Sequence, residues 1–251
     1  MKSKSKKVLH LPEQLKLSYS SIKKFFECPR CFWFAVRGHK RPAETMPGIL
    51  GKRDLKVKKY YDHWRKNGLP PLLKGKVPGI LVDQKTADRL RKGIQYLDKK
   101  LNAVLWGKLD DCLYDPKRKV YIPIDNKSRG AFAKDVHPMD QFQLDVYTFL
   151  LEENSMSTES KAILGEFTDS DSFQLHEISA WKFKGIVLET NPARAKKVFE
   201  EAVRSAASHE KPEPSEACKF CDFMKKTKGE IRAHTREYLE NEQSKKSRKA
   251  R

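Results

Sequence analysis

The sequence predicts an α/β fold, in which a central mixed β-sheet is flanked by helices. Two observations carry this prediction. Segments whose apolar residues recur at helical spacing are interleaved along the chain with short strand-like apolar runs. Four cysteines stand in two C-x-x-C pairs near opposite ends of the sequence, which indicates a shared metal clasp that joins the N-terminal and C-terminal parts.

The first half of the chain is expected to be mainly helical. A helix that begins near Ser18 ends before Pro29, because proline breaks a helix interior but is favoured in the first turn of the next helix. Residues 48–51 are expected to form a loop and residues 54–66 a helix. A further helix is predicted from four apolar residues at the spacing i, i+4, i+7 and i+11, which are Leu90, Ile94, Leu97 and Leu101.

The second half is expected to supply the strands. Residues 103–114 and 120–127 are predicted to form a hairpin around the turn at residues 115–118, which contains Asp115 and Pro116. The other elements expected in this half are two strands and two helices, over residues 162–167, 175–188, 138–153 and from Pro192 onward.

Length and charge limit the classes of protein. A chain of 251 residues fits one large domain, for which we expect residues 17–225, with a flexible basic lead-in at 1–16 and a polar, basic tail at 226–251. Because Lys and Arg number 52 against 33 Asp and Glu, the charge of +19 suggests a polyanionic partner, above all nucleic acid, and the equal alternative is a solvated basic surface. No apolar run is long enough to cross a membrane and no signal-peptide core is present, so we expect a cytoplasmic protein without a membrane partner.

The cysteines indicate a metal centre. Cys28 and Cys31 form one C-x-x-C pair, and Cys218 and Cys221 form the other. Four thiolates suffice for a tetrahedral zinc site or for an iron–sulfur cluster. Separate buried thiols or redox pairs are the alternatives, although no thioredoxin-like context accompanies them. Cys112 has no partner in this scheme and is expected to be a buried strand residue.

The predicted hairpin carries the residues with the clearest chemistry. Asp125 and Lys127 are two apart on a strand, so their side chains share one face, and Asp110 lies on the preceding strand. Converging carboxylates repel each other unless a cation lies between them, and such oxygen ligands suit Mg²⁺ or Mn²⁺. Lys127 can orient water or neutralise developing charge. The alternative is an ordinary ion pair on an exposed hairpin. The neighbouring Asp111 is expected to face the opposite way.

Three short motifs together resemble those of a known family. Gly107-Lys108-Leu109-Asp110, Ile124-Asp125-Asn126-Lys127 and Gln143-Leu144-Asp145-Val146-Tyr147 resemble, in order and spacing, the motifs of the RecB-like branch of the PD-(D/E)XK nuclease superfamily. The resemblance implies a restriction-endonuclease-like core and metal-dependent hydrolysis of DNA, exonuclease-like, on single strands or ends. It implies that Asp110 and Asp125 hold Mg²⁺ or Mn²⁺, that Lys127 assists the attacking water, and that Gln143 and Tyr147 contact the reacting strand.

The resemblance also bears on the cofactor and on the pathway. Similar nucleases of the CRISPR-associated and AddB types hold a four-cysteine iron–sulfur cluster, with one cysteine before the core and three after it, whereas this chain has two and two. The resemblance favours a [4Fe–4S] cluster, with zinc as second choice, and a DNA-repair or CRISPR-like role whose protein partners the sequence does not name.

The residue at the position of the family's metal-binding histidine also departs from the family pattern. Many relatives carry a metal-binding histidine where this chain offers Asp54, an oxygen ligand that can replace it or an ordinary acid at the start of a helix. His63 and His137 are weaker candidates for that role. The main alternative function is a non-catalytic nucleic-acid-binding protein on the same fold, stabilised by zinc.

Overall fold

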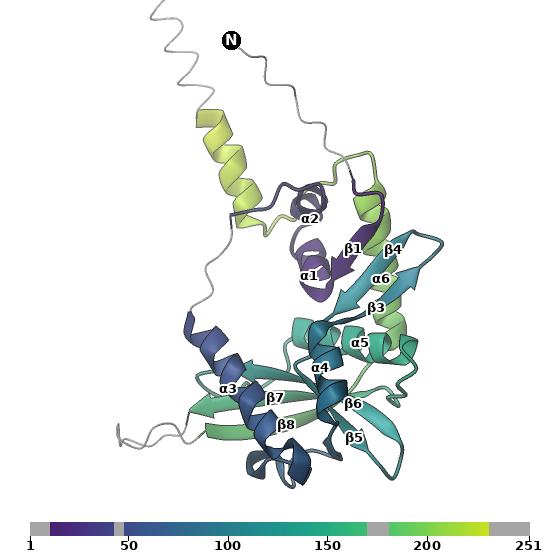
Figure 1. Ribbon diagram of the computed structural model, residues 1–251. Helices are drawn as coiled ribbons and strands as arrows, with labels where there is room; N and C mark the ends of the chain where they lie inside the picture. Colours follow the sequence, from purple (N-terminus) through teal and green to yellow (C-terminus); the bar gives the residue numbers. More distant parts are fainter. Residues whose placement is uncertain (1–10, 43–47, 170–180, 231–251) are drawn as a thin grey trace, which may run out of the picture.

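The computed structural model describes residues 11–42, 48–169 and 181–230, and Figure 1 shows their arrangement. The predicted class is confirmed, since mixed β-sheets are flanked by helices. The elements are β1 (Leu15–Ser18), α1 (Tyr19–Glu27), α2 (Pro29–Val36), α3 (Gly48–Trp64), the short 3₁₀ helices η1 (Arg65–Asn67) and η2 (Pro71–Leu73), β2 (Ile80–Leu81), α4 (Gln84–Lys92), β3 (Ile94–Asp98), β4 (Ala103–Gly107), β5 (Asp111–Asp115), β6 (Val120–Ser128), α5 (Pro138–Glu153), β7 (Lys161–Asp169), β8 (Trp181–Glu189) and α6 (Pro192–Ala207).

The strands form two sheets rather than the one central sheet that the sequence predicted. The smaller sheet has the order β1-β4-β3, with β1 parallel and β3 antiparallel to β4. The larger sheet has the order β2-β5-β6-β7-β8, in which β6 and β7 are parallel and the other neighbours are antiparallel. Helix α5 contacts strands of both sheets and lies between them in Figure 1.

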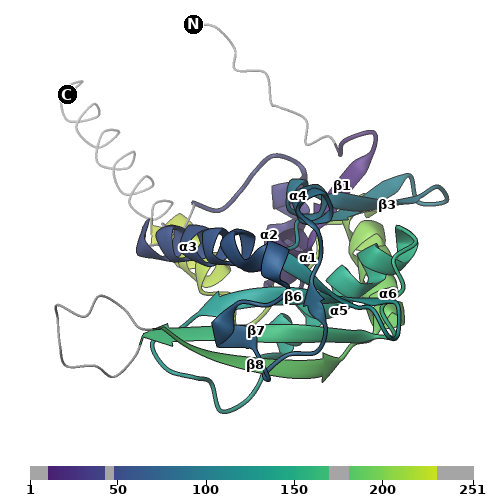
Figure 2. The ribbon, with the colours of Figure 1, turned by 60° about the horizontal axis from the view of Figure 1, so that its bottom comes forward.

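The larger sheet packs helices against both of its faces. On one face, β6 side chains such as Ile122 and Ile124 join Val57 and Tyr61 of α3 in a buried cluster. Figure 2 shows α3 running along this sheet. Because strand side chains alternate, Asp125 of β6 points to the other face, toward α5. The alternation along β6 therefore turns Ile122 and Ile124 toward α3, and it turns the candidate catalytic residue Asp125 toward α5.

Two of the elements predicted between residues 90 and 114 are wrong. The expected strand at 103–114 is two strands in different sheets, because the chain crosses from one sheet to the other between Gly107 and Asp111. The expected helix carrying Leu90 and Ile94 stops at Lys92, since Gly93 has φ +122°, outside the helical region, and β3 follows.

The remaining expectations need smaller corrections. Residues 48–51 belong to α3 rather than to a loop, and β1 begins at Leu15, inside the expected lead-in. The rest of the lead-in up to residue 10, the tail beyond residue 230 and the strand-like segment before Trp181 lie outside the described residues. Within the described ranges, no helix combines the length and the apolar character needed to cross a membrane.

Candidate functional site

The four predicted cysteines come together. Cys28 lies directly before α2 and Cys31 in its first turn, while Cys218 and Cys221 lie at the start of the helical segment 219–230. The Cys31 Sγ atom lies 3.4 Å from the Sγ of Cys221 and 3.7 Å from the Sγ of Cys218. The Cys28 Sγ atom lies 3.8 Å from the Sγ of Cys221. In the described part of the chain, this is the one group of three or more Cys, His, Asp or Glu whose ligand atoms all lie within 4.8 Å of one another.

This cysteine group can hold a metal. Three of the four side chains are buried and the fourth is half-buried. A tetrahedral ion with zinc–sulfur bonds of about 2.3 Å places its sulfur ligands about 3.8 Å apart, close to the separations observed. In a four-iron cluster each cysteine binds a different iron atom, so the sulfurs stand farther apart. The cysteine group could therefore hold a metal, either as a single ion such as zinc or as an iron–sulfur cluster.

One thiol of the group, that of Cys28, has a lowered pKa. Burial opposes the thiolate of Cys28, but hydrogen bonds from the backbone at Cys31 and Ser215 and from neighbouring thiols lower its pKa to about 7. Burial raises the pKa of Cys221 to about 11. A cation bound by the group would favour the thiolates of both.

Beside the cysteine clasp, hydrogen bonds also join α2 and the residue after it to residues 206–212 near the C-terminal end of the described chain. Trp33 Nε1 donates to the carbonyl of Ser208 at 2.9 Å, and Arg30 Nε donates to the carbonyl of Pro212 at the same distance. The Arg37 guanidinium donates to the Ala206 carbonyl at 2.8 Å and lies 3.7 Å above the Trp33 ring. The four cysteines thus join the N-terminal and C-terminal parts, as predicted, and they could hold a metal.

The candidate catalytic residues on β6 and α5 form one connected group. The Lys127 ammonium lies 2.9 Å from Asp125 Oδ2 and donates to Gln143 Oε1 at 2.8 Å. The Gln143 side-chain amide donates to Asp125 Oδ1 and to the Tyr147 hydroxyl, each at 2.8 Å. Gln143 and Tyr147 are one turn apart on α5, which places both beside the same carboxylate.

Asp110 approaches this group from the connection between β4 and β5. Its Oδ2 accepts the backbone N–H of Asn126 at 2.9 Å, and its Oδ1 lies 3.4 Å from the Lys58 ammonium. The same ammonium donates to Asp54 at 2.8 Å. The structure thus places a lysine between Asp110 and Asp54 and does not gather Asp54, Asp110 and Asp125 into one close set of ligand atoms.

The carboxylates of this group are buried, although each faces a lysine. Burial, opposed by Lys127 and reinforced by the negative charge of Asp110, raises the pKa of Asp125 to about 7. Burial also raises the pKa of Asp110. Burial disfavours the Lys127 ammonium, but Asp125 outweighs it and holds the lysine pKa above its usual value. Asp125 Oδ2 is buried and lies 2.9 Å from the Lys127 ammonium.

Sequence reasoning missed three charged residues around Lys127 and Asp110. Asp140 lies 3.5 Å from the Lys127 ammonium, and Arg129 lies 2.6 Å from Asp140 and 2.8 Å from the buried Glu166. Asp140 precedes Gln143 by three residues on a helix, a spacing that could have identified it. Lys58 follows Asp54 by four residues, but nothing in the sequence shows that it also reaches Asp110.

Asp111 faces away from Asp110, as predicted, and forms ion pairs with two arginines. Its carboxylate is fully buried and lies 2.7 Å from Arg65 and 2.6 Å from Arg91. Cys112 is also fully buried, as expected. Of the two weaker candidates for a metal ligand, His137 caps α5 through Nδ1 and His63 stacks against Trp64.

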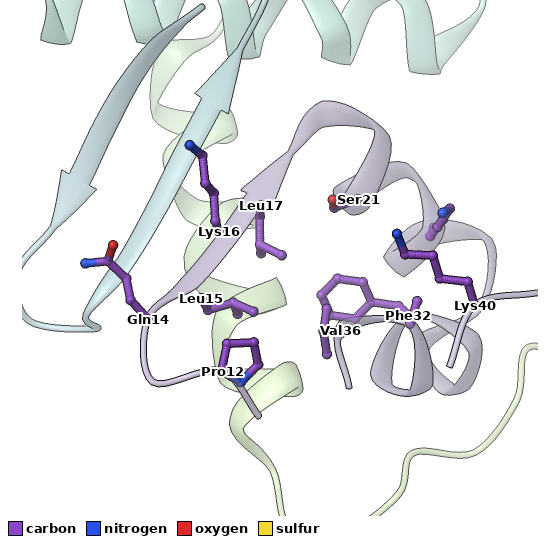
Figure 3. A pocket seen from close by; sticks show the side chains of 11 residues that line it. Pro12, Gln14, Leu15, Lys16, Leu17, Ser21, Phe32, Val36 and Lys40 are labelled. Carbon is purple, nitrogen blue, oxygen red and sulfur yellow. The ribbon is translucent and has the colours of Figure 1, made fainter. Parts of the chain in front are cut away.

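Two cavities lie near these elements. The one beside the candidate site, about 260 Å³, is lined by Ser18, Tyr19, Ser20, Trp106, Gly107, Lys108, Gln143 and Tyr147. The other, about 440 Å³, is shown in Figure 3 between β1 and the helices α1 and α2. It contains none of the candidate catalytic residues, whereas Gln143 and Tyr147 line the smaller one.

Comparisons with known proteins add little. No family model matches the chain, and no curated protein matches it. Among solved structures, the crystal structure of SSO0001 is similar over 78% of this chain and 78% of that one, with 15% sequence identity and a TM-score of 0.42. A similarity at this level carries no weight for function.

Proposed function

We propose that this protein is a metal-dependent nuclease that hydrolyses phosphodiester bonds of DNA, exonuclease-like, on single strands or ends. The observation that carries the proposal is the buried contact group of Asp125, Lys127 and Gln143, next to Asp110 and open to a cavity. Buried carboxylates with raised pKa values beside a lysine are common at functional sites. The net charge of +19 suits a polyanionic substrate.

The oxygen atoms of the site fit a divalent cation. Asp125 Oδ2 is a buried carboxylate oxygen that lies 2.9 Å from the Lys127 ammonium, and Asp110 Oδ1 lies 3.4 Å from the Lys58 ammonium, so each oxygen already faces a positive charge that a bound cation could replace. Carboxylate oxygens are the ligands that Mg²⁺ and Mn²⁺ prefer. Asp110 and Asp125 would hold the ion, with Asp54 as a further ligand if Lys58 moves away. When bound, such an ion supplies charge stabilisation and an activated water.

The other side chains have roles that follow from their contacts. Lys127 keeps its ammonium aligned through Asp125 and Gln143, so it can stabilise negative charge that develops on a phosphate. Gln143 uses both side-chain amide hydrogens on Asp125 and Tyr147 and therefore orients the carboxylate. Tyr147 lines the cavity, where its hydroxyl can donate to the nucleic-acid strand.

For the cysteine group we favour one structural zinc ion, because the sulfur separations suit a single tetrahedral ion. Elemental analysis of protein prepared without oxygen or chelator is expected to give one zinc per chain and no visible absorption. Iron and sulfide in a visible-absorbing sample would assign the [4Fe–4S] cluster instead. The absence of both metals would remove the metal role from these cysteines.

The nuclease proposal is tested by cleavage of labelled single- and double-stranded DNA in Mn²⁺. Asp125→Asn keeps the size of the side chain but loses the charge that holds the cation, so cleavage should fall to background. Asp88→Asn, a matched change on the exposed face of α4, should cut at the wild-type rate. Cleavage by Asp125→Asn at the wild-type rate would refute the assignment.

A second candidate is a nucleic-acid-binding protein on this fold that does not cut DNA. It is favoured by the lysine beside each candidate metal ligand, since Lys127 contacts Asp125 and Lys58 contacts Asp110. In that case the protein would bind DNA in a salt-dependent manner, and no divalent cation would induce cleavage. The Mn²⁺ assay therefore separates the two candidates.

A further inference from the structure

The three-stranded sheet β1-β4-β3 buries one face and exposes the other. Leu15 and Leu17 of β1 and Leu105 of β4 belong to the core. Because side chains alternate along a strand, Lys16 and Gln95 lie on the opposite face, where both are exposed. Figure 3 shows Lys16 pointing away from the side on which Leu15 and Leu17 lie. This open face, which also carries the exposed Leu97, adjoins the candidate site.

An aromatic ring lies on this open face between two cations. Trp106 is half-buried on the central strand β4, in register with Ser18 on one side and Gln95 on the other. The Lys16 ammonium lies 5.3 Å from the centre of its ring and the Lys108 ammonium 5.9 Å. Both lysines are exposed, so each ammonium can leave the ring for another anionic or aromatic contact.

Trp106 also lies beside the candidate active site. Trp106 and Lys108 line the cavity of about 260 Å³ that Gln143 and Tyr147 line as well. Gln143 in turn donates to Asp125 at 2.8 Å. One cavity and the Gln143 side chain therefore connect Trp106 with Asp125.

We propose that Trp106 is a stacking platform for an unpaired base of single-stranded nucleic acid, with Lys16 and Lys108 contacting the phosphates beside it. The proposal deepens the nuclease function and rests on it for the role of the strand, which would run from Trp106 into the cavity. An aromatic ring stacks on any base, and flanking lysines neutralise the backbone. In a duplex the base faces are covered by their neighbours, so the platform selects an unpaired strand.

Binding of a short labelled oligothymidylate, measured in buffer without Mg²⁺ or Mn²⁺, tests the platform. Trp106→Leu keeps apolar bulk but loses the ring, and it should weaken binding about tenfold, as loss of one stacked base does. Trp106→Phe keeps an aromatic face and should retain most of the affinity. The same phosphate backbone without bases should bind wild type and Trp106→Leu equally, because it offers nothing to stack.

The lysines are tested by the salt dependence of the same binding. Lys16→Gln and Lys108→Gln should each reduce the salt slope by about one phosphate contact. Lys117→Gln, an exposed lysine in the β5–β6 turn, is the matched control and should leave the slope unchanged. Changes of equal size at Lys16 and Lys117 would overturn the assignment of the phosphate contacts.

Two outcomes would overturn the platform. One is wild-type affinity of Trp106→Leu for oligothymidylate. The other is an equal loss for the base-free strand, which would mean general damage to the sheet. Neither outcome decides whether the protein cuts DNA, since cleavage depends on Asp125. Conversely, an uncleaved substrate with ring-dependent binding would leave the platform standing and would favour the binding-only protein.

Discussion

The two faces of the β5–β6 hairpin handle buried charge in different ways. On the α3 face, Asp111 lies between Arg65 and Arg91, and Asp62 completes the network with contacts of 2.9 and 2.8 Å. Although burial opposes ionisation of Asp62, the two arginines hold its pKa below the usual value. On the α5 face the pKa of Asp125 is raised instead, chiefly by burial. The first face satisfies its charges internally, whereas the second leaves a carboxylate that a bound cation would stabilise.

The largest effect on stability is expected at Asp111. Asp111→Ala leaves Arg65, whose side chain is only 3% exposed, without its buried partner, so we expect a loss of about 3–5 kcal/mol in the free energy of unfolding. Urea unfolding followed by circular dichroism measures it. Asp110→Ala is the matched comparison and should cost much less, because the Asp110 carboxylate is 21% exposed and burial already raises its pKa. Equal losses at both positions would erase the contrast between the two faces.

The next effect is catalytic and is expected at Lys127. Lys127→Met removes the ammonium that Asp125 and Gln143 align, so cleavage in Mn²⁺ should slow by about 10²–10³-fold. Lys134→Met, an exposed lysine in the loop before α5, provides the control for loss of one positive charge. A similar slowing in both variants would point to weaker DNA binding rather than to a role at the reacting phosphate.

The smallest effect is expected at Lys58, which contacts both Asp54 and Asp110. Its ammonium competes with any cation for Asp110, so Lys58→Met should lower the Mn²⁺ concentration needed for half-maximal cleavage by about two- to fivefold, the scale of a partly exposed ion pair. Lys56→Met changes an exposed lysine on the same helix and should leave this concentration unchanged. A higher Mn²⁺ requirement in Lys58→Met would show that the lysine positions Asp110 instead.

Local sequence signals predicted the elements that position the candidate site. Helix α5 has the predicted bounds, Pro138–Glu153, because its two signals, a proline in the first turn and a long apolar stripe, lie within the segment itself. The wrong predictions arose where a pattern is shared by two structures. The apolar residues from Leu90 to Leu101 fit a helix, yet Gly93 ends it and the rest form β3. The crossing of the chain between two sheets at residues 108–110 leaves no local signal.

The contacts of the candidate site were predictable only in part. The alternation along β6 predicted that Asp125 and Lys127 share a face, because strand geometry fixes it. The contact of Lys58 with Asp110 joins α3 to the β4–β5 connection, and such a contact depends on how α3 lies across the sheet. The partners of Asp111 are likewise distant in sequence, so its structural role could not be inferred from the chain alone.

The cysteine clasp has a consequence for the order of events during protein synthesis. Cys28 and Cys31 leave the ribosome long before Cys218 and Cys221, so the four-ligand centre cannot close until nearly all of the described chain has been made. The long separation adds little to the entropic cost of closure, which grows only with the logarithm of loop length. A chain interrupted before Cys218 keeps α2 in contact with α1 and α6 but has only the first C-x-x-C pair. Closure of the four-cysteine group is therefore a late step that follows the docking of α2.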